Sequence, residues 1–265
     1  MKLKRKTWTA LILFFALFMA VPLTVQAGWK TNSSGDSYYY NNKGVLQKNK
    51  WIGRRYVDKK GKWVKNRSYV EISKYSKKLN QLVLVEANGN RATVSLHTKN
   101  AKGQWDVKLT ASGYVGRNGV GKTREGDMKT PSGIFTMSKA FGINKNPGTS
   151  MAYRKVDNTW YWVSDPSSKY YNKFVTTKKV KRDWNEAERI IDYRTAYKYV
   201  LSVDYNTKCI PGKGSAIFLH CSTGGPTAGC VSVPESSMKK ILCQIKPGAR
   251  IAIGTAGSLK KLLGC

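Results

Sequence analysis

Two apolar runs flank a loop of small residues between Ser215 and Pro234, and this stretch constrains the fold more than any other. The first run, residues 216–219, ends at His220, and the second begins directly after Cys230. Short apolar runs bounded by turn-forming residues are typical of buried strands. Two such strands joined by the loop would bring the imidazole of His220 and the thiol of Cys230 together.

A thiol becomes a good nucleophile only as a thiolate, and a nearby imidazole lowers its pKa and accepts its proton. His220 is the obvious partner for Cys230. The other histidine, His97, lies in an alternating pattern with Val94 and Leu96 that is typical of an ordinary strand. We therefore take Cys230 and His220 as the candidate nucleophile and base.

The sequence from residue 82 onward predicts a mainly β domain. Alternating runs separated by turn residues indicate strands at Leu82–Val85, Ala92–Leu96 and Trp105–Leu109. Strands at this spacing favour a β-sandwich or barrel-like fold. Further along we expect a strand at Trp160–Val163, a short helix at Asn185–Ile191, a strand at Tyr197–Asp204 and a last strand at Arg250–Ile253.

A helix is predicted directly after the Cys230 loop. Pro234 suits a first helical turn, and the negative charge of Glu235 complements the positive end of a helix. The apolar face that would pack on the sheet has the i, i+3, i+4, i+7 spacing of Met238, Ile241, Leu242 and Ile245. The fold should thus contain one or two short helices.

The N-terminus has the pattern of a secretory signal peptide. Basic residues precede an apolar run from Leu11 to Val21, and small residues follow near Ala27. The alternative is a permanent membrane anchor, but the run is shorter than the roughly 18 residues that a spanning helix needs. We expect residues 1–27 to be removed, leaving no stable membrane span.

A repeat follows the expected signal peptide. Residues 39–49 align with residues 56–66, and each unit contains an aromatic strand, an Asn/Asp-x-x-Gly turn and a second short strand, which is a hairpin pattern. We expect a β-hairpin arm at 28–67, a lysine-rich linker at 68–77, a catalytic domain at 78–254 and a tail at 255–265.

The segment Gly116–Thr123 matches the phosphate-binding P-loop pattern, and we reject that interpretation. A P-loop must open a helix whose N-terminus holds the phosphates. The residues that follow here, 124–127 and 130–133, are turn formers. No nucleotide, metal or other cofactor is expected.

Two motifs resemble the L,D-transpeptidases of bacterial cell walls. One is His220 followed by a Gly-rich loop and Thr227–Ser232, and the other is the Lys-x-x-x-Gly-Asp-x-x-Thr-Pro-x-Gly-x-Phe pattern within Gly121–Phe135. They lie about a hundred residues apart, so their joint occurrence is far more specific than either alone. The resemblance covers residues 78–254.

The resemblance implies a role for each residue of the loop. Cys230 would be the nucleophile, His220 the base, and Cys221 the residue whose carbonyl orients the imidazole. Gly229 and Ser232 would lie on the oxyanion or substrate side. The chain departs from the family at Ala228, where the family has a second histidine, and at Ser232, where it has arginine or asparagine.

The implied function is that of an exported enzyme forming 3–3 cross-links between peptidoglycan tetrapeptide stems, acting in the cell wall. Carbapenems would acylate Cys230. One alternative is an L,D-carboxypeptidase that uses water as acceptor, and another is a wall-binding protein with a degenerate site, which Ala228 and Ser232 favour. A sortase-like reaction also uses Cys and His, but its threonine before the Cys strand and its later arginine are not matched.

The hairpin repeats resemble choline-binding cell-wall repeats, whose aromatic rings form cages for a quaternary ammonium. Lys and Arg throughout the units would repel a cation, which favours an anionic wall polymer such as teichoic acid. The formal charge of +32 also draws the protein to polyanions. Nucleic acid is not expected, because the basic residues are scattered rather than grouped on a reading motif.

The cysteine count is odd, which in an exported protein leaves one thiol unpaired. A nucleophile plus two possible disulfides fits this count. The pairing of the others stays open, and no Cys-x-x-Cys spacing suggests a metal site. The remaining cysteines are Cys209, Cys221, Cys243 and Cys265.

Overall fold

The computed structural model describes residues 26–265. The signal peptide expected at 1–27 therefore lies, except for its last two residues, outside the described residues. The chain divides into two compact units, one of residues up to 50 with 57–63 and one of residues 51–56 with 64–265. Within the part that is described, no helix is long and apolar enough to cross a membrane.

The smaller unit contains the first predicted repeat and residues 57–63 of the second. In this unit strand β1 (Gly28–Thr31) pairs antiparallel with β2 (Ser37–Tyr40). The short strands β3 (Lys50–Ile52) and β4 (Arg55–Val57) pair with each other and consist mostly of residues 51–56, which belong to the larger unit. The side chains of Asn41 and Asp58 each accept hydrogen bonds from the backbone N–H groups two and four residues on. These equivalent turns, at equivalent places in the two units, account for the sequence repeat.

The larger unit is built on a curled sheet of ten strands, which confirms the mainly β, barrel-like fold class. Its strands in spatial order are β10 (Tyr153–Lys155), β9 (Ala140–Gly142), β14 (Val200–Ser202), β15 (Phe218–Cys221), β16 (Val231–Val233), β7 (Trp105–Tyr114), β6 (Arg91–Lys99), β5 (Gln81–Asn88), β17 (Arg250–Thr255) and β8 (Gly133–Thr136).

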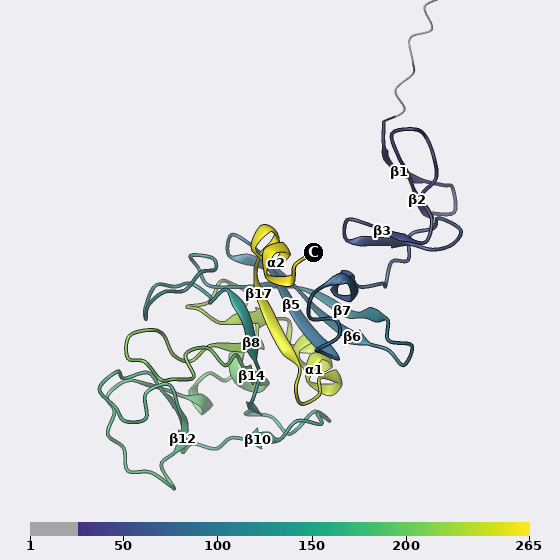
Figure 1. Ribbon diagram of the computed structural model, residues 1–265. Helices are drawn as coiled ribbons and strands as arrows, with labels where there is room; N and C mark the ends of the chain where they lie inside the picture. The colour runs from purple at the N-terminus through teal and green to yellow at the C-terminus, as the bar shows by residue number, and fades with distance from the viewer. Residues whose placement is uncertain (1–25) are drawn as a thin grey trace, which may run out of the picture. The chain divides into compact units, whose positions relative to one another are not determined.

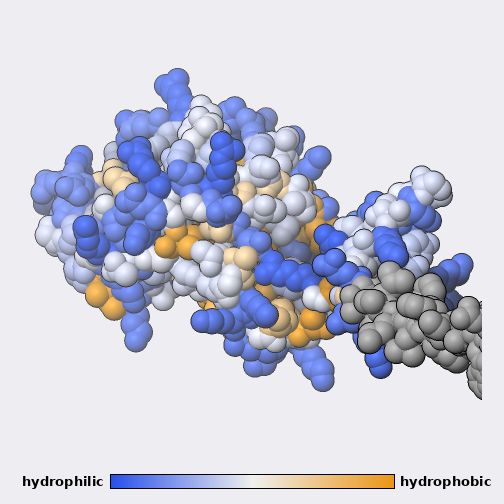
Figure 2. All heavy atoms as spheres, turned by 90° about the horizontal axis from the view of Figure 1, so that it is seen from above, coloured by the Kyte–Doolittle hydropathy of each residue, from blue (hydrophilic) through white to orange (hydrophobic). Residues whose placement is uncertain are grey.

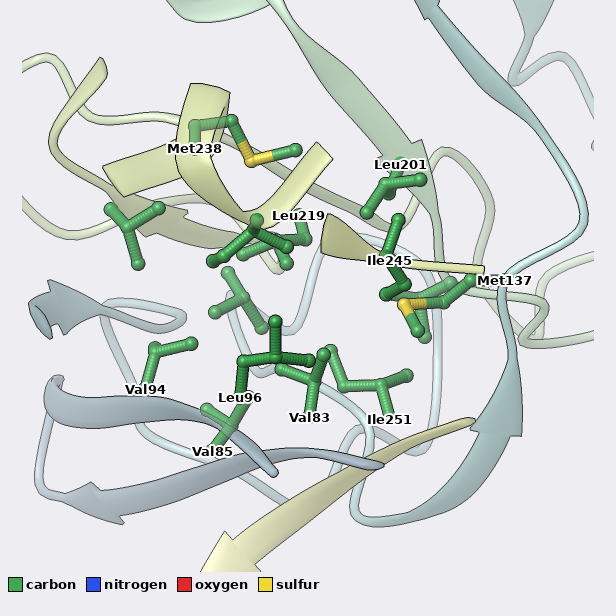
Figure 3. Packing of buried hydrophobic residues seen from close by; sticks show 14 of the residues in the cluster. Val83, Val85, Val94, Leu96, Met137, Leu201, Leu219, Met238, Ile245 and Ile251 are labelled. Carbon is green, nitrogen blue, oxygen red and sulfur yellow. The ribbon is translucent and has the colours of Figure 1, made fainter. Parts of the chain in front are cut away.

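Two helices cover opposite faces of this sheet at β5 and β17 (Figure 1). Val83 and Val85 pack with helix α1 (Glu235–Gln244), whereas Leu82 and Leu84 pack with helix α2 (Ala256–Leu263). Successive side chains of a strand point to opposite faces, and both faces of β5 are covered, so all four of these positions are apolar. Figure 3 shows the α1 side, where Met238 of the helix, Leu219, and Val94 and Leu96 of the sheet belong to one cluster.

Helix α1 matches the prediction, and its four apolar positions are fully buried. Helix α2 lies within the segment expected to be a tail. Its first turn is capped by Thr255, whose side chain accepts a hydrogen bond from the N–H of Ser258. Its Leu259 and Leu263 are fully buried. The threonine cap and the spacing of these leucines were a helix pattern that the sequence reasoning overlooked.

The helix predicted at Asn185–Ile191 is wrong. Residues Ala187–Arg189 form strand β13, which pairs antiparallel with one edge of β11 (Trp160–Val163). The other edge of β11 pairs with β12 (Phe174–Thr176). Within the predicted segment and just after it, only the single turn η2 (Ile190–Asp192) is helical. Helix-forming residue types were overridden by pairing with a neighbouring strand. The strand expected at Tyr197–Asp204 is shortened to β14, because Tyr197 belongs to the short 3₁₀ helix η3 (Ala196–Lys198).

The segment 68–77, expected as a linker, packs onto the sheet. It contains the 3₁₀ turn η1 (Tyr69–Ile72), and its Val70 is fully buried. The Oγ of Ser68 lies 2.6 Å from Nδ1 of His97, and Oγ of Ser95 lies 2.7 Å from Nε2 of the same ring. His97 is thus a structural strand residue, as predicted. Its burial lowers its pKa to about 4.

We predict that His97 makes the protein sensitive to acid. Its pKa is about 4 in the folded chain and about 6.5 in an unfolded one, so the stabilisation present above pH 6.5 is lost as pH falls through 4. His97→Gln keeps a donor and an acceptor but does not titrate. Its free energy of unfolding should therefore fall by about 2–3 kcal/mol less than that of the wild type between pH 7.5 and 4.5.

Urea unfolding at the two pH values measures this difference. His220 is the second buried histidine with a pKa lowered to about 4. His220→Gln is therefore the matched comparison, and it should reduce the acid-dependent loss of unfolding free energy by a similar amount. An acid sensitivity unchanged in His97→Gln would contradict the prediction.

Candidate active site

The candidate nucleophile and base lie on the same face of two neighbouring strands. Strands β15 and β16 are parallel, with Leu219 opposite Val231 and His220 opposite Ser232. Leu219 and Val231 point into the core on the α1 side. Alternation along the strands therefore places Cys230, which directly precedes β16, and His220 together on the other face.

The ring of His220 has a defined tautomer. Its Nδ1 lies 2.8 Å from the carbonyl oxygen of Cys221, and a carbonyl can only accept, so Nδ1 carries the proton. Nε2 of the neutral ring is therefore free to accept one. Burial lowers the pKa of His220 to about 4, and the hydrogen bond to Cys221 opposes this shift. The edge-on ring of Tyr197 packs against the imidazole at 5.5 Å between centroids.

The thiol of Cys230 is held by the backbone of β15 and the residues before it. Its Sγ donates to the carbonyl of Ala216 and accepts from the N–H of Phe218, each at 3.3 Å. Burial raises its pKa, and so does the negative charge of Glu188. Among residues 26–265 no hydrogen bond joins the Cys230 and His220 side chains. The resting pair is therefore a neutral thiol and a neutral imidazole.

A pocket of about 500 Å³ lies beside Cys230. Cys230, Gly229 and Ala228 line one part of it, and Glu188 and Tyr193 line another. Of the residues expected at the site, Cys230 and Gly229 line the pocket, whereas His220, Cys221 and Ser232 are not among its lining residues.

Gly229 is closely packed. A Cβ at this position would lie 3.1 Å from the carbonyl oxygen of Lys129 and 3.2 Å from Cδ1 of Ile217, closer than most side chains tolerate. Its N–H donates to Oγ1 of Thr227 at 3.1 Å. This amide is therefore engaged with Thr227 in this structure.

The two sequence motifs meet at the backbone of Cys230. Its carbonyl accepts hydrogen bonds from Oγ1 of Thr227 at 2.7 Å and from Oγ1 of Thr130 at 3.1 Å. Thr130 belongs to the Thr-Pro-x-Gly segment and also accepts from the N–H of Gly116 at 2.8 Å. Residues a hundred positions apart thereby fix the position of the candidate nucleophile.

The other predicted site residues are buried. Ser232 is fully buried, and its Oγ is one of the buried polar atoms without a hydrogen-bond partner in the described part of the chain. The Sγ of Cys221 lies in the core on the α1 side, 3.8 Å from the carbonyl of Tyr199. All five cysteines are unpaired, so the structure contains neither of the two possible disulfides.

The region that resembles a P-loop is irregular. No helix follows Gly116–Thr123 before residue 133, as the rejection of a nucleotide site requires. Within residues 26–265 no group of three metal-ligating side chains gathers.

Sequence reasoning missed two residues that adjoin the site. Glu188 on β13 accepts a hydrogen bond from the hydroxyl of Tyr197, the residue whose ring contacts His220. Burial raises the pKa of Glu188 to about 7. No pattern could have identified the pair, because both residues lie in the region where the secondary structure was mispredicted.

A buried ion pair was also missed. Lys122 Nζ lies 2.9 Å from Oδ1 of Asp127, and the two side chains are 2% and 8% exposed. Burial opposes ionisation of Asp127, but hydrogen bonds from Lys122 and from three backbone N–H groups hold its pKa well below the usual range. Both residues belong to the Lys-x-x-x-Gly-Asp pattern, which could have indicated the pair.

Comparisons with known proteins agree with these motifs. The family described as YkuD, L,D-transpeptidase catalytic domain, matches residues 81–253. None of the curated proteins matches the chain. A crystal structure of a mutant L,D-transpeptidase from Enterococcus faecium is similar over 87% of this chain and 75% of that one, at 11% identity and a TM-score of 0.30, which is too low to support an argument.

The family match covers more than half of the chain and includes Thr130, His220 and Cys230. The chain belongs to the L,D-transpeptidase catalytic domain family.

Proposed function

We propose that this protein is an exported peptidoglycan L,D-transpeptidase that forms 3–3 cross-links through an acyl-enzyme at Cys230. The observation that carries the proposal is the arrangement of Cys230 and His220. The two side chains share one face of neighbouring strands, the thiol lines a pocket, and Nε2 of His220 is unprotonated. Family membership supports peptidoglycan as the substrate class.

In this mechanism the neutral pair reacts only when substrate arrives. A substrate carbonyl that enters the pocket draws Sγ of Cys230 away from the carbonyl of Ala216, and the thiol proton passes to Nε2 of His220. Sulfur attacks the amide carbonyl between the third stem residue and the following D-alanine. The C–N bond breaks, and D-alanine leaves with the proton from His220. An amine from a neighbouring stem then takes the acyl group, and the thiol is regenerated.

Tyr197 and Glu188 are positioning residues in this proposal. The ring of Tyr197 restrains the imidazole, and the Glu188 carboxylate holds the Tyr197 hydroxyl. Burial and the negative charge of ionised Glu188 both raise the pKa of the Cys230 thiol, which keeps the resting sulfur protonated.

A second candidate is a wall-binding protein whose site has lost activity. It is favoured by the orientation of the thiol, which contacts Ala216 and Phe218 rather than His220, and by the unpartnered hydroxyl of Ser232. An L,D-carboxypeptidase would use the same acyl-enzyme with water as acceptor.

The expected partners follow from charge and from the hairpin unit. The protein carries +32, and the face in Figure 2 is mostly hydrophilic with small separate hydrophobic areas. In the hairpins, the Lys30 ammonium lies 5.2 Å from the centre of the Tyr40 ring, so the protein's own cation occupies a ring face that a choline cage would need. We therefore propose tetrapeptide stems as substrate, anionic polymers such as teichoic acids as wall ligands, and a location in the cell wall.

The proposed activity predicts which products the protein forms from peptidoglycan stems. Incubation of the mature chain with a disaccharide-tetrapeptide should yield a cross-linked dimer and free D-alanine, identified by mass. Cys230→Ala should lower the rate by about 10³-fold or more, because no other group can form the acyl-enzyme. The exposed thiol of Cys243 is the matched control, and Cys243→Ala should retain the wild-type rate.

Tripeptide without dimer would assign the carboxypeptidase. No product, or full activity in Cys230→Ala, would favour the wall-binding protein.

The burial of His220 predicts how the acylation rate depends on pH. Because the pKa of His220 is about 4, its ring stays neutral and can accept the thiol proton over the range in which an ordinary histidine protonates. The rate of carbapenem acylation, measured by intact mass, should not fall between pH 7 and pH 5 and should drop as pH is lowered through about 4.

Circular dichroism at each pH identifies loss of rate that comes from unfolding. A rate that halves near pH 6.5 while the protein stays folded would contradict the buried, neutral His220.

A further inference from the structure

Lys122 is buried beside the candidate nucleophile. A Cβ on Gly214 would lie 2.5 Å from Cε of Lys122, and a Cβ on Gly229 would lie 3.6 Å from its Nζ. The lysine stem therefore packs against Gly214, where there is no side chain in the way. Its ammonium lies beside Gly229, the residue that directly precedes Cys230. Lys122 lines the same pocket as Cys230.

The ammonium of Lys122 has unused hydrogen-bond donors. A lysine head carries three N–H groups. Within residues 26–265 the acceptor recorded for Nζ is Oδ1 of Asp127, at 2.9 Å. Unmatched donors in a buried position are costly until an acceptor arrives. The position of this head is fixed, because Asp127 is itself held by three backbone N–H groups.

The proposed reaction gives such a donor a use beside Cys230. Attack of Cys230 on a carbonyl creates an oxyanion, which enzymes stabilise with preorganised donors. The N–H of Gly229 is already donated to Thr227, and Ala228 offers no polar side chain. The other charged groups lining the pocket are the acidic Glu125, Glu186 and Glu188, which would repel the oxyanion.

We propose that the Lys122 ammonium is a catalytic group that donates a hydrogen bond to the oxyanion formed when Cys230 attacks the substrate carbonyl. This inference rests on the proposed acyl-enzyme. In the step, the Sγ–C bond forms, the carbonyl π electrons move to oxygen, and the thiol proton goes to His220. Lys122 stays protonated throughout. When the C–N bond breaks, the electron pair returns from oxygen and the hydrogen bond weakens.

The test compares two reactions of Cys230 in the full mature chain. A carbapenem acylates the thiol through an oxyanion, whereas iodoacetamide alkylates it by displacement without one. Lys122→Met removes the ammonium and keeps the apolar stem. It should slow acylation by about 100-fold and slow alkylation of Cys230, followed by peptide mass mapping, much less.

Three further variants keep the result interpretable. Lys122→Arg, which retains a cation, should recover part of the acylation rate. The double variant Lys122→Met with Asp127→Asn leaves no unpaired carboxylate, so it should fold while still acylating slowly. Lys178→Met removes a lysine of the exposed pair with Asp157 and should behave as the wild type.

Two outcomes would overturn the inference in distinguishable ways. A Lys122→Met protein that acylates at the wild-type rate, or that loses acylation and alkylation equally, would remove the role of Lys122 and leave the nucleophile in place. A wild-type protein that forms no carbapenem adduct on Cys230 would remove the proposed nucleophile, and the role of Lys122 with it.

Discussion

The parallel pairing of β15 with β16 is the constraint on which the candidate site depends. The register that sets His220 opposite Ser232 leaves Cys230 on the same face as the imidazole. Parallel neighbours require the connecting loop to run back along the strands. That loop is held where Thr227 and Thr130 both donate to the Cys230 carbonyl. A shift of one residue in the pairing would turn Cys230 into the α1 core.

Burial decides the electrostatics of the site. The thiol and the imidazole are both desolvated, which raises the pKa of Cys230 and lowers that of His220 to about 4. Each shift favours the uncharged form, so the site differs from cysteine enzymes that rest as a thiolate and an imidazolium. Activation then depends on the substrate, which must bring its carbonyl within reach of Sγ and of donors such as Lys122.

The sequence was informative wherever a local pattern matched the final packing. The first three predicted strands of the domain form within β5, β6 and β7, and the four apolar positions predicted for the helix after Cys230 are fully buried. At Ala187–Arg189, pairing with β11 overrode helix propensity, and no local pattern records a partner that distant.

The candidate nucleophile and base could be predicted from the sequence, whereas the packing around them could not. Cys230 and His220 followed from residue type and spacing, because the chemistry demands a thiol and a base. The close packing around Gly229 could not be predicted, because a Cβ there would meet atoms of Lys129 and Ile217, which no local pattern places beside it.

One measurement tests the account most directly: acid-quenched protein, trapped during turnover of a disaccharide-tetrapeptide, is digested and the peptides are weighed. The account predicts the mass of a stem acyl group, lacking D-alanine, on the peptide that contains Cys230. Steady turnover with that peptide unmodified, or with the acyl group on another residue, would contradict it.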